Sequence, residues 1–167
     1  MYDYVVVLLT DSIGEEQVFS CRKVLEEFGI KCTEKLPPHI TIDLYKNINQ
    51  ALLLEIVASL VKQIKSFSFE VEEINHFNNN VYFFRPNHLE QFKMIKRRFD
   101  EALSLYAIKD NENKGIYHPH ITIVSGNNIV FPTIVEQSFI PFQSEITDLC
   151  VYNNQKQLIK KYPLNGR

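Results

Sequence analysis

The sequence predicts an α+β fold in which two similar halves pack around a central groove. An identical pentapeptide occurs at 38–42 and again at 119–123, and each copy lies in an apolar, β-branched run. The copies begin 119 − 38 = 81 residues apart in a chain of 167 residues, which indicates an internal duplication. We therefore expect one bilobal domain over 1–167, with lobes of 1–77 and 78–167. Two antiparallel-rich sheets, with or without exchanged strands, should face the groove and carry helices outside.

In the first half, the pattern predicts strand, helix, motif strand, helix and strand. Five apolar residues at helical spacing predict the first helix, and Gly29 follows it as a stop. The second helix is predicted from the clearest amphipathic pattern in the chain. The last strand of this half is predicted from the strict alternation of apolar and polar residues. The expected ranges are 4–10, 18–28, 39–45, 53–64 and 67–72.

The second half repeats this order and adds two strands. A helix should begin at Pro86-Asn87 with a capping box between Asn87 and Glu90. A polar loop over 109–115 precedes the second motif strand, which should begin at Pro119. The other expected elements are strands at 81–85, 142–152 and 157–162 and a short helix at 133–137.

Composition narrows the class of protein. Hydrophobic residues make up 45% and charged residues 23%, which is ordinary for a globular domain. The net charge of −2 gives no general attraction to nucleic acid, so an RNA contact would need a local basic patch.

The apolar run at 5–9 is too short to span a membrane and has no basic region before it, so we expect neither anchor nor signal peptide. The cysteines, Cys21, Cys32 and Cys150, are odd in number and show no paired spacing. They predict reduced thiols rather than a disulfide or zinc framework. We expect a cytoplasmic monomer without a membrane partner.

The repeated motif carries the reactive residues. In each copy a histidine stands two positions before a threonine, so both side chains lie on the same face of a strand. Imidazole titrates near pH 6.5 and can act as general acid or base. A threonine hydroxyl can donate to a phosphate oxygen. We therefore predict His39 and His120 as catalytic residues and Thr41 and Thr122 as phosphate-binding residues, all in one cleft.

Several further residues are weaker candidates. Arg85 ends a strand that could approach the groove, and Tyr45 and Tyr117 flank the motifs, so these three are predicted substrate contacts. A basic run on one helix favours a solvated face, with an RNA-backbone track as the alternative. Its members are Lys93, Lys96, Arg97 and Arg98.

His118 raises the alternative of a metal site, because His118-x-His120 has a familiar metal-ligand spacing. It has no equivalent in the first copy, where Leu36 or Pro37 stands near that place. No constellation of Cys, Asp or Glu completes a site. We therefore predict no metal and no cofactor.

The paired His-x-Thr-x motifs, half a chain apart and each on a strand after a helix, resemble those of the two-histidine (2H) phosphoesterase superfamily. This superfamily includes 2′-5′ RNA ligase-like proteins and cyclic nucleotide phosphodiesterases. The resemblance implies a bilobal α+β fold, metal-independent chemistry and catalytic roles for His39, Thr41, His120 and Thr122. It implies hydrolysis, or reversible formation, of 2′,3′-cyclic phosphate or 2′-5′ phosphodiester bonds. The partner would be an RNA end or a small nucleotide.

The chain also departs from the RNA ligase-like pattern. That branch commonly carries an aromatic residue three positions after the first motif threonine and an arginine three positions after the second. Here Leu44 and Ser125 occupy those positions, which indicates a less characterised branch.

Two other functions remain open from the sequence. A histidine-triad nucleotide hydrolase would use a His-x-His-x-His strand, but Thr122 occupies the third position. A catalytically idle RNA- or nucleotide-binding module would keep the groove for recognition alone. Intact histidine and threonine in both copies favour the enzyme.

Overall fold

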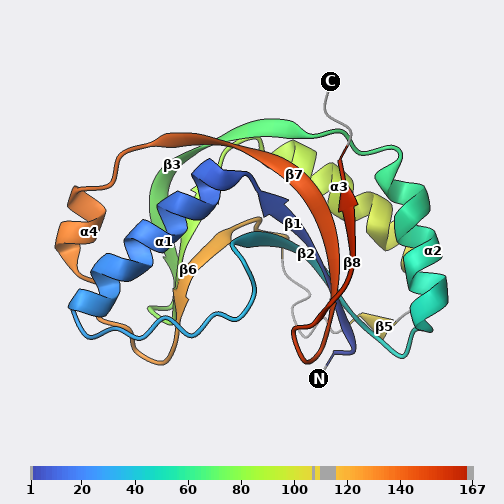
Figure 1. Ribbon diagram of the computed structural model, residues 1–167, viewed down its shortest axis with the longest axis horizontal. Helices are drawn as coiled ribbons and strands as arrows, with labels where there is room; N and C mark the ends of the chain where they lie inside the picture. Colours follow the sequence, from blue (N-terminus) through green and yellow to red (C-terminus); the bar gives the residue numbers. More distant parts are fainter. Residues whose placement is uncertain (1, 107, 110–115, 165–167) are drawn as a thin grey trace.

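The computed structural model describes residues 2–106, 108–109 and 116–164, so most of the expected loop at 109–115 lies outside the described residues. Helices and strands alternate much as expected, and the two motif copies lie at the start of β2 and β6 (Figure 1). In chain order the elements are β1 (Tyr4–Thr10), α1 (Ser12–Glu27), β2 (His39–Lys46), α2 (Gln50–Val61), β3 (Phe67–Phe77), β4 (Val81–Pro86), α3 (Leu89–Leu103), β5 (Ile108–Lys109), β6 (Ile121–Ser125), α4 (Thr133–Gln137), β7 (Phe142–Asn153) and β8 (Leu158–Pro163).

The strands pair antiparallel in the order β1-β2-β6-β4-β3-β7-β8, and β5 adds to β2. The long strand β7 also pairs with β1, so the pairings lead from β1 round to β7 and back to β1. The α+β class and the antiparallel pairing are confirmed. The two expected sheets are joined into one eight-stranded sheet, which is strongly bent (Figure 1).

Both motif strands contain a β-bulge at the last isoleucine of the motif. In β2, Val7 lies opposite Thr41 while Val6 lies opposite Asp43, which leaves Ile42 as the extra residue. In β6, the register against β4 skips Ile123 in the same way. Because a bulge shifts the alternation by one residue, side chains beyond it point to the opposite face from the one that simple alternation predicts.

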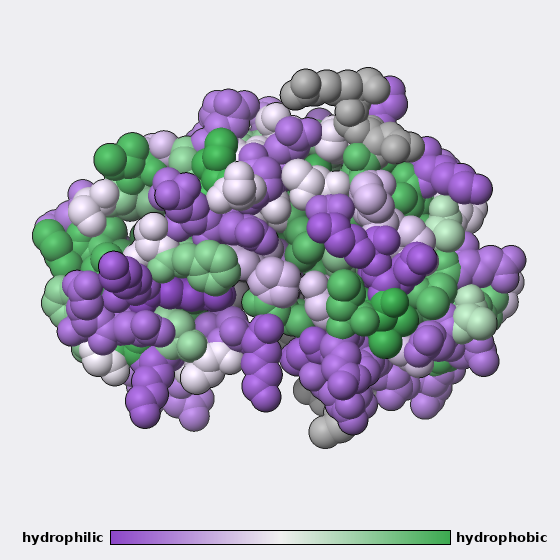
Figure 2. Space-filling view, in the orientation of Figure 1, coloured by the Kyte–Doolittle hydropathy of each residue, from purple (hydrophilic) through white to green (hydrophobic). Residues whose placement is uncertain are grey.

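The core lies between the sheet and the helices. Helix α1 lies beside α4 and contacts β6 and β7, whereas α2 lies beside α3, which covers β2 (Figure 1). The buried cluster is continuous from one helix pair to the other and includes Ile40 and Ile121 of the motif strands. Polar and hydrophobic residues are mixed over the visible face, and hydrophobic ones gather at the end that carries α4 (Figure 2). No helix among the described residues is long and apolar enough to cross a membrane.

The expected capping box at α3 is wrong. The helix begins after His88, which has a positive φ of 54° and makes no side-chain cap hydrogen bond. The Asn87 side chain instead accepts a hydrogen bond of 2.8 Å from the backbone N–H of Glu70 and donates one of 3.3 Å to its carboxylate. The Asn87 side chain, which the sequence pattern assigned to the cap of α3, is therefore bound by the neighbouring strand β3.

Several element boundaries also differ. Helix α1 begins at Ser12 rather than near residue 18, and β3 runs to Phe77 rather than ending at residue 72. Strand β6 begins at Ile121 rather than at Pro119, so His120 precedes the strand. Helix α2 ends at Val61, and Ile64 is buried in the turn that follows.

Candidate active site

The pairing of β2 with β6 brings the reactive side chains of both copies together. Ile40 lies opposite Ile121 in antiparallel register, so each motif histidine stands across from the threonine of the other copy. Both isoleucines are fully buried in the core, and side chains alternate along a strand, so the four reactive groups share the opposite face. We call these four the motif quartet: His39, Thr41, His120 and Thr122.

The two imidazoles are held in the same way. Nδ1 of His39 lies 2.7 Å from the carbonyl oxygen of Pro37, and Nδ1 of His120 lies 2.8 Å from that of His118. A carbonyl can only accept, so Nδ1 carries the proton in each ring. Nε2 is therefore the nitrogen left to take or give a proton, which is the arrangement that acid–base catalysis requires.

Burial keeps both imidazoles neutral at neutral pH. It lowers the pKa of His39 to about 4, and the positive charges of Lys156 and Arg22, together with that of His120 when it is protonated, act in the same direction. The hydrogen bond to the Pro37 carbonyl opposes this effect. Burial also lowers the pKa of His120. An anionic phosphate bound between the rings would raise both pKa values, because it stabilises the charged imidazolium.

A side chain from the other half of the chain braces each motif threonine. The hydroxyl of Tyr117 donates to the carbonyl oxygen of Thr41 at 2.9 Å. The guanidinium of Arg22 donates to the carbonyls of Thr122 and Ile123 at 3.1 and 2.8 Å. Bulges interrupt the regular ladder at these points, and buried carbonyls need partners from elsewhere. The two halves therefore hold each other's motif in place.

Arg22 belongs to a larger connection between α1 and β6. Its Nη2 lies 4.0 Å from Glu34, and both side chains are nearly buried. Glu34 in turn accepts hydrogen bonds from the backbone N–H and the hydroxyl of Ser125, at 2.7 and 2.9 Å. Sequence analysis missed Arg22, since nothing in its helical context distinguishes it from a surface cation. Ser125, where the RNA ligase-like pattern has an arginine, anchors the end of β6.

The predicted substrate contact at Tyr45 is wrong. Simple alternation from Thr41 places Tyr45 on the quartet face, but the bulge at Ile42 moves it to the helix face. Its side chain is fully buried, so no base can stack on it. The same shift turns Asp43 inward, where its carboxylate lies 2.8 Å from Lys96 of α3.

The basic run on α3 does not form one continuous track. Lys96 is committed to the buried Asp43, and Arg98 donates to the carbonyl of Gln63. Arg97 is largely exposed and pairs loosely with Glu101 at 3.9 Å. These contacts fit the interpretation of a solvated helix face with some structural cations better than the alternative of an RNA-backbone track.

Arg85 and Tyr117 line one cavity of about 300 Å³, between β3, β4, the start of α3 and the segment before His120. The quartet itself does not line this cavity, but Phe77 and Phe83 do, and their rings pack against His120. The hydroxyl of Tyr117 is engaged with Thr41, so its role there is to position β2. Arg85 is half exposed and lies 3.0 Å from Glu73.

His118 lines the same cavity, and its carbonyl holds His120. The described residues contain no group of three or more His, Cys, Asp or Glu side chains placed to hold a metal ion. Within the described residues, therefore, no further ligands are placed to complete a metal site at His118 and His120. Metal independence remains a prediction.

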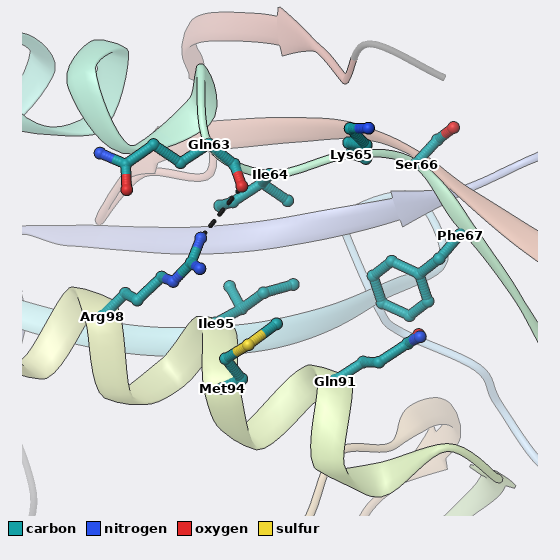
Figure 3. Close-up of a pocket in the computed structure, with 9 residues that line it drawn as sticks. All are labelled: Gln63, Ile64, Lys65, Ser66, Phe67, Gln91, Met94, Ile95 and Arg98. Atoms are coloured by element: carbon teal, nitrogen blue, oxygen red, sulfur yellow. Dashed lines mark hydrogen bonds between the residues drawn. The ribbon is translucent and has the colours of Figure 1, made fainter. Parts of the chain in front are cut away.

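A second cavity, of about 330 Å³, lies away from the motif quartet. The segment between α2 and β3 forms one side and α3 the other, with Arg98 reaching across to Gln63 (Figure 3). Most of the surface exposed inside this cavity is apolar, and Phe67 and Ile95 are among the residues that line it. Neither the quartet nor the two rings that pack against His120, those of Phe77 and Phe83, line it, so we do not include it in the candidate site.

Solved structures share this fold. A protein described as a phosphoesterase matches with a TM-score of 0.68 and 12% identity, over 98% of both chains. LigT of E. coli, complexed with phosphate, matches with a TM-score of 0.65 and 12% identity, also over 98% of both. TT0787 of Thermus thermophilus matches with a TM-score of 0.67 and 12% identity, over 99% of both. At these identities the likeness concerns the fold. Comparison with curated proteins yields no match.

The sequence also matches a family model directly. The model describes the 2′-5′ RNA ligase superfamily, and the match covers residues 10–158. This range contains both motif copies and all four of the described helices. On this match, the chain belongs to the 2′-5′ RNA ligase superfamily.

Proposed function

We propose that this protein is a metal-independent phosphoesterase that opens 2′,3′-cyclic phosphates, or cleaves 2′-5′ phosphodiester bonds, at RNA ends or in nucleotides. The observation that carries the proposal is the antiparallel register of Ile40 with Ile121, which supports two imidazoles and two hydroxyls on one face. The family match and LigT, which was crystallised with phosphate and with 3′-AMP, are consistent with a nucleotide substrate.

The chemistry follows from the groups in the quartet. One histidine takes a proton from water at Nε2, and the water oxygen forms a new bond to phosphorus. The bond from phosphorus to a ribose oxygen breaks on the opposite side. The other histidine, which carries a second proton at Nε2 once the bound phosphate has raised its pKa, gives that proton to the leaving oxygen. The hydroxyls of Thr41 and Thr122 donate to the nonbridging oxygens, where charge redistributes in the transition state. The reverse sequence of steps would join two ends.

A turnover assay tests this proposal. Adenosine 2′,3′-cyclic phosphate and 2′-5′-linked diadenosine are offered with and without EDTA, with 3′-5′-linked diadenosine as the control. We expect hydrolysis of at least one of the first two, unchanged by EDTA and abolished in the double variant His39→Ala/His120→Ala. Loss of activity in EDTA that a divalent ion restores would favour the His118–His120 metal site instead. Nucleotide binding without turnover would identify a binding module.

A further inference from the structure

The cavity beside His120 has the position of a substrate subsite. It lies between β3, β4 and the start of α3, and His118 and Pro119, which lead directly into His120, form part of its wall. Its volume of about 300 Å³ is at the small end of the usual range for ligand pockets, about 300–1,000 Å³. It is large enough to hold one nucleotide unit.

One wall of this cavity is aromatic. The rings of Phe77 and Phe83 lie 4.4 Å apart between centroids, and Phe77 is 37% exposed. The ring of His120 stands edge-on to Phe77 at 5.2 Å and lies 5.0 Å from Phe83. A base stacked on this wall would lie next to the imidazole, and stacking on aromatic side chains is a common way to hold an unpaired base.

The cavity also presents positive charge. Arg85 and Lys93 both line it, and none of the described residues that line it carries a carboxylate. Each cation pairs with a glutamate at the rim: Arg85 with Glu73 at 3.0 Å and Lys93 with Glu90 at 2.8 Å. Exposed pairs of this kind are weak, and a guanidinium has five N–H donors, so an incoming phosphate can engage both cations.

We propose that this cavity binds the nucleoside that carries the scissile phosphate and recognises its 5′-phosphate through Arg85 and Lys93, with the base on the exposed ring of Phe77, which Phe83 supports from behind. This inference rests on the proposed function and names its substrate class: nucleotides with a phosphate at the 5′ position as well as at the reacting 2′,3′ end. The 3′ end of an RNA chain has this chemistry, and so does a free nucleotide phosphorylated at both ends.

The test compares two substrates that differ by one phosphate. Adenosine 2′,3′-cyclic phosphate and its 5′-phosphorylated form have the same base and the same scissile bond. At fixed ionic strength, we expect kcat/KM to be about tenfold higher for the 5′-phosphorylated form, the effect of roughly one charge-assisted hydrogen bond. In Arg85→Gln and Lys93→Gln this ratio should fall toward one. Arg97→Gln, on the same helix as Lys93 but outside the cavity, is the matched control and should keep the ratio.

A binding measurement keeps the inference testable without turnover. Calorimetry with adenosine 3′,5′-bisphosphate and adenosine 3′-phosphate should show the same preference for the 5′-phosphate and the same loss in the two variants. Equal Kd values for the two ligands, or a preference that survives both substitutions, would overturn the subsite. Absence of turnover with an intact binding preference would reject the proposed activity and leave the subsite standing.

Discussion

The two copies of the pentapeptide are identical in sequence and differ in what surrounds them. Both imidazoles donate from Nδ1 to the carbonyl two residues earlier, and both strands bulge at the last isoleucine. The first copy, in β2, is braced by the neutral phenol of Tyr117, whereas the second, in β6, is braced by the guanidinium of Arg22. The repeat therefore specifies local geometry, and the rest of the fold determines the electrostatics of each copy.

The open side of the two copies differs as well. His120 packs against Phe77 and Phe83 beside a cavity, while the positive charges of Lys156 and Arg22 act on His39. Lys156 lies in the turn between β7 and β8, with its ammonium close to the hydroxyl of Tyr2. The second copy therefore has the aromatic rings and the cavity beside it, whereas the first has the additional positive charges near it.

The largest effects should come from the histidines themselves. His39→Ala and His120→Ala should each lower kcat/KM about 10²-fold or more, the usual contribution of a general acid or base. In the wild type, kcat/KM should be bell-shaped with both limbs below pH 6.5, because both pKa values are lowered in the free protein. Each variant should lose one limb, which assigns acid and base. A flat profile would show that the motif supports only the fold.

Replacing Arg22 should remove the backbone brace of the second copy and also change the titration of His39 in the first. Arg22→Gln removes two hydrogen bonds to the backbone of β6 and leaves Glu34 without its cation, so we expect a loss of about 3 kcal/mol in the free energy of unfolding. It should also raise the pKa of His39, followed by NMR titration, whereas Arg22→Lys keeps the charge and should not. Arg97→Gln, at an exposed ion pair, is the control for loss of a cation. An unchanged β6 and unchanged stability in Arg22→Gln would contradict the bracing role.

Acid should destabilise the protein through His39. The ordinary pKa of histidine is about 6.5, and that of His39 is lowered to about 4. Between these values the unfolded chain binds a proton that the folded chain does not, so stability falls as the pH drops from 6.5 toward 4. The loss is at most about 3 kcal/mol. Urea unfolding of His39→Asn should show a shallower dependence of stability on pH in this window than the wild type does. A variant curve parallel to that of the wild type would rule out this origin.

The motif threonines should be equivalent. Thr41→Val and Thr122→Val keep the shape of the side chain and remove one donor, so each should weaken transition-state binding by about 1–3 kcal/mol without moving the pH limbs. Steady-state kinetics on the 2′,3′-cyclic substrate, measured over a range of pH, give the loss in kcat/KM and the positions of the pH limbs for each variant. Full activity in one variant alone would mean that only one copy holds the phosphate.

The smallest effect should follow removal of the Tyr117 hydroxyl group, which braces the first copy. Tyr117→Phe leaves the ring in place and takes one hydrogen bond from the Thr41 carbonyl, which should cost about 1 kcal/mol of stability. Tyr106→Phe, at an exposed position, is the matched control. If thermal unfolding gives equal values for the two variants, the contact between Tyr117 and Thr41 carries no measurable energy.

Local sequence pattern predicted most of the elements correctly, because hydrophobic periodicity reports which face of a segment is buried. The strands expected at 4–10 and 81–85 and the end of the first helix before Gly29 agree with the structure to within one residue, although that helix begins earlier than expected, at Ser12. The errors lie where another part of the chain competes. Asn87 hydrogen-bonds to β3 instead of capping α3, and the bulge at Ile42 takes Tyr45 out of the groove.

The sequence alone determined which residues could do the chemistry, since a repeated His-x-Thr-x in a strand places both groups on one face whatever the strand packs against. Only the tertiary structure decided which partners each group meets. The register of Ile40 with Ile121, the braces from Arg22 and Tyr117, and the cavity with Arg85 all join segments far apart in the chain. Local periodicity carries no information on such contacts, because they depend on how distant elements pack. The lowered pKa of His39 belongs to the same class, since burial by the whole fold is its main cause.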